Sequence, residues 1–359
     1  MRIESIEGKN IKQLPLFLPP PICYALFAAV KMCVIALHPS AFNWLHNNFI
    51  QLTFYEEFLS KPDFQNHFAG IWPVDSLRLD QRGANLLLNE YVVDNNVFDL
   101  TPDTLVEHMI AWLNKDMYIY ADVNVTKLST TKNYGIEPPY AHSALIFGYD
   151  LSKKIFKMID FLANGRLDIV DIPFADFADA YFCPHLEEIF KTKRHMNRKY
   201  FMTLYKLRSD FVFDLNPNII KYWLNEFMSC SPTNEKYAFI IYCEKMLGGF
   251  SVYEAMIELS KKLFNERGIF EYRMFHAIYD HKKLMLSRVE ALQYKQFLDP
   301  KLSLTGAAQE LIDITDRMRL KVIKNRIKVT SGIIESLDKD MNELIEKEKR
   351  FMDTLYSNI

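Results

Sequence analysis

The chain has 359 residues, of which 49% are hydrophobic and 14% aromatic. This length allows about two domains with buried cores, and this composition excludes a disordered chain, which cannot bury enough apolar surface to fold. The formal net charge of -2 provides no global field that would attract nucleic acid or an anionic membrane. We therefore expect a folded protein without a nucleic-acid partner.

Glycine is scarce, with 11 residues where average usage of about 7% would give roughly 25. Phosphate-binding loops need glycine where the backbone approaches an anion closely. The motifs of nucleotide, dinucleotide, zinc and calcium sites are absent, as is the GxSxG motif of serine hydrolases. The sequence therefore predicts no cofactor and no metal.

The five cysteines are an odd number in a chain too long to need disulfide cross-links, which favours a reduced, cytoplasmic location. The longest apolar run, residues 22–37, is shorter than the ~20 residues of a membrane span and contains Lys31. Acidic residues and a proline block precede it, unlike the basic head of a secretory signal. No membrane association is expected.

A helix is expected to begin near Cys23, after the proline block 19–21. The amides and the dipole at a helix N-terminus lower the pKa of a thiol. Cys33 lies deeper in the same run and lacks this position. Cys23 is therefore a candidate nucleophile, and the alternative is a small buried hydrophobic residue.

Three segments before residue 190 are typical of strands in one sheet. They are rich in aromatic and β-branched residues and are separated by turn-forming residues: 117–125, 143–149 and 155–160. A hairpin centred near Leu151 and Ser152 would set Ala144 opposite Asp160 and make His142 a diagonal neighbour of Asp160 on one face. A one-residue slip would separate them onto opposite faces.

A carboxylate beside an imidazole fixes its tautomer and stabilises its protonated form. His142 and Asp160 are therefore candidates for a general base and the residue that orients it. The alternatives are a structural histidine at the start of a strand and an aspartate that caps the following turn.

After residue 190 nearly every apolar pattern has the helical period, over 219–228, 236–247, 252–264, 307–330 and 333–356. We therefore expect an α+β fold, with a domain at 1–190 that contains an antiparallel sheet and an all-α domain at 191–359. The boundary is the basic stretch 191–199, which is either a solvated linker or a docking patch for an acidic partner.

Two features of the helical half have open interpretations. A polar cluster is formed by Arg273, His276, Asp280, His281 and Lys282. Helical spacing places the first three on one side, with Lys282 turned away, and the cluster is either a polar network between domains or part of a substrate site. In the last helix, apolar residues at three-four spacing are interrupted by Glu348. This stripe packs on its own domain or mediates oligomerisation.

The stretch from His142 to Asp150, with Asp160 downstream, resembles the histidine-to-aspartate segment of papain-like, double-glycine-peptidase-like cysteine domains. In these a histidine opens a strand, Gly-Tyr-Asp marks the turn and an aspartate closes the next strand. The chain more closely resembles the butirosin biosynthesis protein H-like proteins, which are associated with nonribosomal peptide biosynthesis. The residues that carry this second resemblance lie in both halves, at 44–52, 118–122 and 273–285.

The resemblance implies a papain-like first domain and a cysteine-dependent acyltransferase or amidase of peptide or secondary-metabolite biosynthesis. Cys23 would accept an acyl group from the thioester of an acyl-carrier or peptidyl-carrier protein and pass it to a small-molecule amine or a peptide. His142 would be the general base and Asp160 its orienting residue. Proteolysis of a leader peptide would use the same chemistry.

The chain departs from the family pattern at the oxyanion donor. Papain-like sites place a glutamine about six residues before the cysteine, where it donates to the oxyanion, and here that position is Phe17. Gln13 is further away, and Gln51 belongs to a different segment. The alternative function is therefore a catalytically inactive papain-like accessory protein that binds a peptide or carrier-protein partner.

Overall fold

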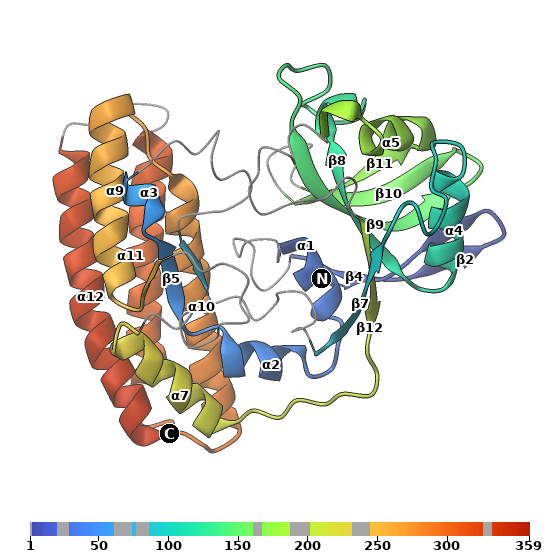
Figure 1. Ribbon diagram of the computed structural model, residues 1–359. Helices are drawn as coiled ribbons and strands as arrows, with labels where there is room; N and C mark the ends of the chain where they lie inside the picture. The colour runs from blue at the N-terminus through green and yellow to red at the C-terminus, as the bar shows by residue number, and fades with distance from the viewer. Residues whose placement is uncertain are drawn as a thin grey trace. The chain divides into compact units, whose positions relative to one another are not determined.

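The structure, a computed structural model, describes residues 2–19, 29–60, 74–76, 86–160, 167–186, 202–231, 245–325 and 332–359. These residues divide into two compact units (Figure 1). Of the described residues, the first unit contains 2–19, 29–39, 86–160, 167–186 and 202–211, and the second contains 40–60, 74–76, 212–231, 245–325 and 332–359. The chain therefore contributes residues 40–60 and 74–76 to the second unit before it returns to the first.

The first unit is built on an antiparallel sheet. In the described part of the chain this sheet has eight strands, in the order β11-β10-β9-β8-β12-β7, with β3 pairing with β9 and β2 with β3. The strands are β2 (Ile6–Gly8), β3 (Ile11–Gln13), β7 (Leu88–Val93), β8 (Tyr118–Asn124), β9 (Ala141–Asp150), β10 (Ile155–Asp160), β11 (Asp168–Pro173) and β12 (Met202–Leu207).

Short elements complete the first unit. The strands β1 (Arg2–Ile3) and β4 (Leu16–Phe17) form a separate pair. The helices are α1 (Ala29–Ile35), α4 (Leu105–Asn114) and α5 (Phe174–Tyr181), with the 3-10 turn η1 (Val125–Lys127) directly after β8.

The central strand β8 shows why this part of the sequence forms a sheet. All seven of its residues are buried, and β-branched and aromatic side chains fill most of its positions. It lies between β9 and β12, so that both of its backbone edges are hydrogen-bonded. The predicted hairpin is present, because β9 pairs with β10 in antiparallel register.

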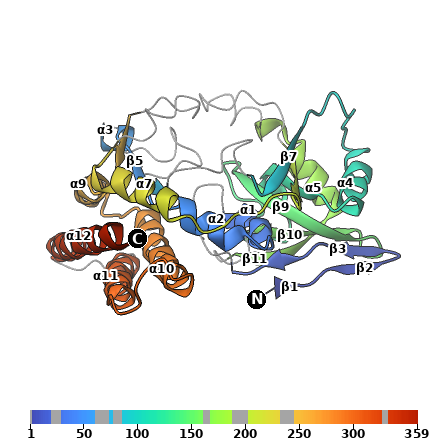
Figure 2. The same cartoon turned by 90° about the horizontal axis from the view of Figure 1, so that it is seen from below.

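The second unit is mainly helical. Its helices are α2 (Ala41–Asn48), α3 (Glu57–Ser60), α7 (Pro217–Met228), α9 (Ser251–Arg267), α10 (Tyr272–Tyr294), α11 (Leu304–Asn325) and α12 (Ile333–Asn358). A small sheet accompanies them, with β5 (Leu52–Tyr55) between β13 (Met246–Gly248) and β6 (Val74–Ser76). Figure 2 looks along α10, α11 and α12 and shows them side by side.

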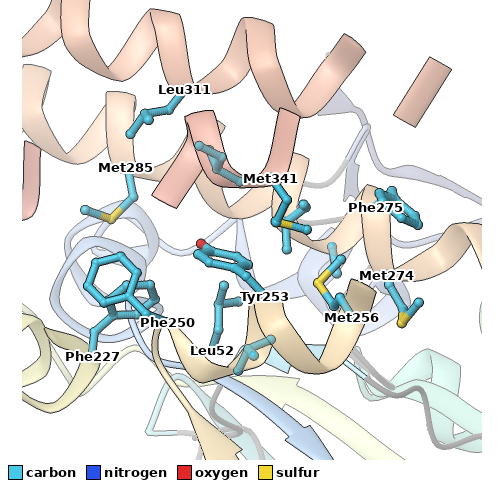
Figure 3. Packing of buried hydrophobic residues seen from close by; sticks show 14 of the residues in the cluster. Leu52, Phe227, Phe250, Tyr253, Met256, Met274, Phe275, Met285, Leu311 and Met341 are labelled. Carbon is cyan, nitrogen blue, oxygen red and sulfur yellow. The ribbon is translucent and has the colours of Figure 1, made fainter. Parts of the chain in front are cut away.

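One large apolar cluster holds the second unit together. Figure 3 shows Leu52 of β5 among methionine and aromatic side chains of the helices, including Tyr253 and Met341. Phe54 of the same strand is also fully buried in this cluster. Burial of each such side chain contributes about 1.5–3 kcal/mol. The cluster therefore explains why residues 50–58 belong to the helical unit although they are distant from it in sequence.

The α+β class with antiparallel strands in the first half and helices in the second is observed. The predicted division at residue 190 differs from the structure, since residues 40–60 pack in the second unit and β12 belongs to the sheet of the first. The expectation of an all-α segment from 191 onward is wrong, because β12 and β13 are strands. Their backbones pair with strands far away in sequence, which local periodicity cannot reveal.

Candidate functional site

His142 is the second residue of β9 and is half-buried. Its backbone lies opposite Val123 of β8. The ring nitrogen Nδ1 is 3.1 Å from the carbonyl oxygen of Ser143. A carbonyl only accepts hydrogen bonds, so Nδ1 is the donor in this contact. The contact holds the orientation of the imidazole at the start of β9.

The hairpin of β9 and β10 has the predicted pairing only in the part that lies beyond a register shift. Near the turn, Lys157 is opposite Gly148, and past a register shift Ile159 is opposite Leu145. Continued by one residue, this second register sets the backbone of Asp160 opposite Ala144, as the sequence predicted. The side chain of Asp160 and the whole of Cys23 lie outside the described residues, so their positions relative to His142 remain predictions.

The register shift accompanies a close approach of a third strand. At Gly148 an added Cβ would lie 2.5 Å from the carbonyl oxygen of Lys12 on β3. The same glycine pairs with Gln13, so β9 is hydrogen-bonded on both edges at this point. Only glycine leaves room for this contact, and a bulge at such a position changes the register of the rest of the strand.

Helix α1 lies on the face of the sheet opposite His142. The ammonium of Lys31 on α1 lies over the rings of Tyr120 and Tyr205, 6.0 and 5.0 Å from their centroids. Along β8, Tyr120 and Val123 are three positions apart and point to opposite faces. His142 shares the face of Val123, its directly paired residue. The described part of α1 is therefore across the sheet from the imidazole.

A row of polar side chains lies beneath α1. Lys31 Nζ is 3.6 Å from Glu90 Oε1, and both side chains are less than a tenth exposed. Ser143 donates a hydrogen bond from its hydroxyl to Asp122. Burial raises the pKa of Tyr120 well above its usual value, and the charge of Asp122 raises it further. This row anchors α1 to the sheet and keeps the tyrosine neutral.

Sequence reasoning missed this row, although a signal for it exists. Tyr118, Tyr120, Asp122 and Asn124 alternate with apolar residues along β8. Such alternation predicts one polar face on a strand. It does not show that a lysine from a helix would meet that face.

Both glutamines considered as oxyanion donors have structural hydrogen bonds. The Gln13 side chain donates to the carbonyl oxygen of Glu4 at 3.1 Å. Gln51 belongs to the second unit, is fully buried, and accepts from the backbone amide of Gly249 at 3.1 Å. Its amide nitrogen also donates to the carbonyl oxygen of Glu226 at 3.2 Å. The oxyanion donor remains unassigned.

The predicted polar cluster of the helical half separates into two places. Arg273 is bound to Glu271 at the start of α10, with Nε 2.5 Å from the carboxylate. His281 and Lys282 instead lie inside the core of the second unit, where His281 Nε2 is 2.7 Å from the carbonyl oxygen of Ile50. Burial and the neighbouring Lys282 hold the pKa of His281 well below its usual value, so this ring is neutral.

Lys282 and Glu348 form a fully buried ion pair between α10 and α12. The hydroxyl of Tyr253 donates to the second oxygen of Glu348 at 2.6 Å, and Lys282 Nζ is 3.0 Å from Nδ1 of His281. Burial lowers the pKa of Lys282 and the charge of Glu348 opposes that effect. This network lies in the core of the helical unit and links α9, α10 and α12.

Glu348 is also the residue that interrupts the apolar stripe of the last helix. The stripe residues pack in the core of their own unit, namely Leu337, Met341, Leu344, Phe351 and Leu355. For these residues the stripe therefore packs on its own domain, which is the first of the two predicted interpretations. Glu348 interrupts the stripe because it pairs with Lys282.

Three of the five cysteines are described, and each is a free thiol. Cys33 and Cys183 are buried, and Cys230 is half-buried. The side-chain amide of Asn124 donates to the sulfur of Cys183 at 3.3 Å. Among the residues that the structure describes, no group of three acidic, histidine or cysteine side chains could hold a metal ion. In the same residues, none of the helices combines the length and apolar character that a membrane span requires.

The basic stretch 191–199 lies outside the described residues, so the choice between a linker and a docking patch stays open. No protein-family model matches the chain, and a search of curated proteins found no match.

Proposed function

We propose that the first unit catalyses acyl transfer through a cysteine thioester, with Cys23 as nucleophile, His142 as general base and Asp160 as the residue that orients the base. The observation that carries the proposal is the state of His142. Its Nδ1 is bound to a backbone carbonyl, and the ring is half-buried at the start of β9. A general base needs a ring orientation that is held in this way.

In the proposed reaction, Nε2 of His142 takes the proton of the Cys23 thiol. The thiolate attacks the carbonyl carbon of a carrier-bound thioester, the new C–S bond forms, and the carrier thiol leaves with the proton from the imidazolium. An amine then attacks the acyl-enzyme and gives a proton to Nε2, the C–N bond forms as the C–S bond breaks, and the Cys23 thiolate takes the proton back from the imidazolium. The proposal requires the Cys23 sulfur to lie at the end of the sheet where β9 begins.

Alkylation of the intact protein by iodoacetamide at pH 7 tests this proposal. An activated thiol reacts as the thiolate, so Cys23 should be labelled at least tenfold faster than Cys33, Cys183 and Cys230, as peptide mass spectrometry will show. A second arm uses an acyl thioester and should give a covalent adduct on Cys23. Slow labelling of all cysteines alike would exclude the enzyme.

The variant His142→Ala should lower the rate of Cys23 labelling and raise its apparent pKa toward the ~8.5 of a free thiol. The matched control is His108→Ala, since His108 is a half-buried histidine on α4 of the same unit. An equal effect of the two variants would remove the general-base role.

The second candidate is a non-catalytic protein that binds a peptide or carrier-protein partner. Two observations favour it: α1 lies across the sheet from His142, and the side chains of Gln13 and Gln51 already bind backbone groups. A non-catalytic protein would bind its partner equally well with Cys23→Ala, and its Cys23 would show no enhanced alkylation. The labelling experiment therefore separates the two candidates.

A further inference from the structure

The loop between β8 and β9, residues 125–140, is closed at its base by hydrogen bonds. The amide of Val125 donates to the carbonyl oxygen of Tyr140 at 3.0 Å. The side-chain oxygen of the buried Asn124 accepts from the amides of Thr126 and Tyr140 at 3.1 and 3.3 Å. The two ends of the loop are therefore joined through one asparagine.

The interior of this loop is fixed as well. The amide of Gly135 donates to the carbonyl oxygen of Thr126 at 2.9 Å, which brings the middle of the loop next to its base. The amide of Ser129 donates to Asp176 on α5 at 3.0 Å, and the hydroxyl of Thr131 donates to the carbonyl oxygen of Leu128 at 3.0 Å. Compact loops of this kind often carry binding sites.

Three large apolar side chains on this fixed loop remain open to solvent. The exposed fractions are 59% for Tyr134, 50% for Ile136 and 53% for Tyr140. The ring of Tyr140 contacts that of His142, with centroids 5.9 Å apart and planes tilted by 43°. A group bound against the exposed ring of Tyr140 therefore lies next to the imidazole of His142.

We propose that Tyr140, together with Tyr134 and Ile136 of the same loop, binds an aromatic or branched aliphatic group of the acyl substrate on which His142 acts. Aromatic surfaces bind such groups favourably, and a loop already held in place loses little conformational entropy on binding. This inference rests on the proposed function, because it places the acyl chain next to the candidate base.

The test measures binding separately from chemistry. Full-length Cys23→Ala protein is titrated calorimetrically with two soluble cysteamine thioesters, one phenylacetyl and one acetyl. Burial of a phenyl group gives at least tenfold tighter binding of the phenylacetyl compound. In the Tyr140→Ala background this preference should fall to about twofold, and Tyr140→Phe should retain it.

The matched control is Tyr91→Ala on β7, a tyrosine of the same unit with 48% exposure. It should leave the preference unchanged, and circular dichroism checks that each variant is folded. Equal binding of the two thioesters, no measurable binding of either, or an unchanged preference in Tyr140→Ala would each overturn the inference.

The two proposals fail in different ways. A phenylacetyl preference that depends on Tyr140, combined with an unreactive Cys23 in the wild-type chain, removes the enzyme and keeps the binding site. A reactive Cys23 without any preference keeps the enzyme and removes the binding site.

Discussion

Arg288 of α10 donates a hydrogen bond from Nε to the carbonyl oxygen of His46, near the end of α2, at 2.6 Å. Its Nη2 donates to the carbonyl oxygen of Phe49 at 3.0 Å, and the arginine is fully buried. The last carbonyls of a helix have no partners within the helix and carry partial negative charge. Burial lowers the pKa of Arg288 to about 9, so the guanidinium is still charged at neutral pH.

Replacing Arg288 should destabilise the second unit. In Arg288→Met the carbonyls of α2 lose their donor, and we expect the free energy of unfolding to fall by about 3 kcal/mol in urea denaturation. Arg317→Met is the control, because the Arg317 side chain is 43% exposed and its partner Asp340 keeps a second cation, Lys321. Its effect should stay below about 1 kcal/mol. Equal losses in the two variants would contradict the capping role.

The buried pair of Lys282 and Glu348 should behave non-additively in a double-mutant cycle. Lys282→Met leaves a carboxylate without its cation in the core, and a loss of about 3–5 kcal/mol in unfolding free energy is expected. The double variant Lys282→Met with Glu348→Leu removes both charges and should lose less than Lys282→Met alone. A double variant whose loss equals the sum of the two single losses would show that the charges are independent.

The stability of the second unit should decrease as the pH falls below about 6.5. Burial and the charge of Arg288 lower the pKa of His46 to about 3, and burial with Arg319 lowers that of His276 to about 4. Each unfolded histidine binds a proton near pH 6.5 while the folded one does not. The contribution of these neutral rings is therefore complete above pH 6.5 and is lost as the pH falls toward 4 and then 3.

Melting temperatures of the wild type and of His46→Gln between pH 7.5 and 4.5 will measure this effect. Glutamine does not titrate, so in His46→Gln the unfolding free energy should fall less steeply with decreasing pH than in the wild type. The difference should be up to roughly 1.4 kcal/mol per pH unit. Parallel curves for the two proteins would mean that His46 does not contribute to the acid sensitivity.

Two glycine-to-alanine changes should alter the unfolding free energy in opposite directions. At Gly148 the new Cβ would lie 2.5 Å from Lys12 O and 3.0 Å from the Cα of Gln13, so β3 must move. We expect a loss of about 1–3 kcal/mol in unfolding free energy. At Gly306, within α11, nothing lies within 4 Å of the added atom, and alanine should stabilise the helix by about 0.5–1 kcal/mol. Denaturation with guanidinium will show whether Gly148→Ala is less stable and Gly306→Ala more stable than the wild type.

Patterns with a short period predicted much of the secondary structure. The apolar, aromatic and β-branched runs at 143–149 and 155–160, separated by turn-forming residues, predict the hairpin that β9 and β10 form. The three-four spacing of the last segment predicts α12, including the place where Glu348 interrupts it. These features depend on residues a few positions apart, which the sequence displays directly.

Longer-range relationships were not predictable in the same way. The strand β12 was assigned to the helical half, yet it pairs with β8 across about 80 residues of sequence. The face occupied by His142 depends on its pairing with Val123, and the position of α1 depends on Lys31 meeting two tyrosines of separate strands. No local pattern contains these pairings.

The candidate site separates the properties that the sequence determines from those that the tertiary structure determines. The amino-acid sequence alone determined which residue types could perform thiol chemistry and that His142 opens a strand, because strand periodicity and side-chain chemistry are local properties. Only the tertiary structure decided that the imidazole and the described part of α1 occupy opposite faces, and that Lys282 and Glu348 meet in the core. Such placements follow from how strands and helices pack to bury apolar surface, and this packing is a property of the whole chain.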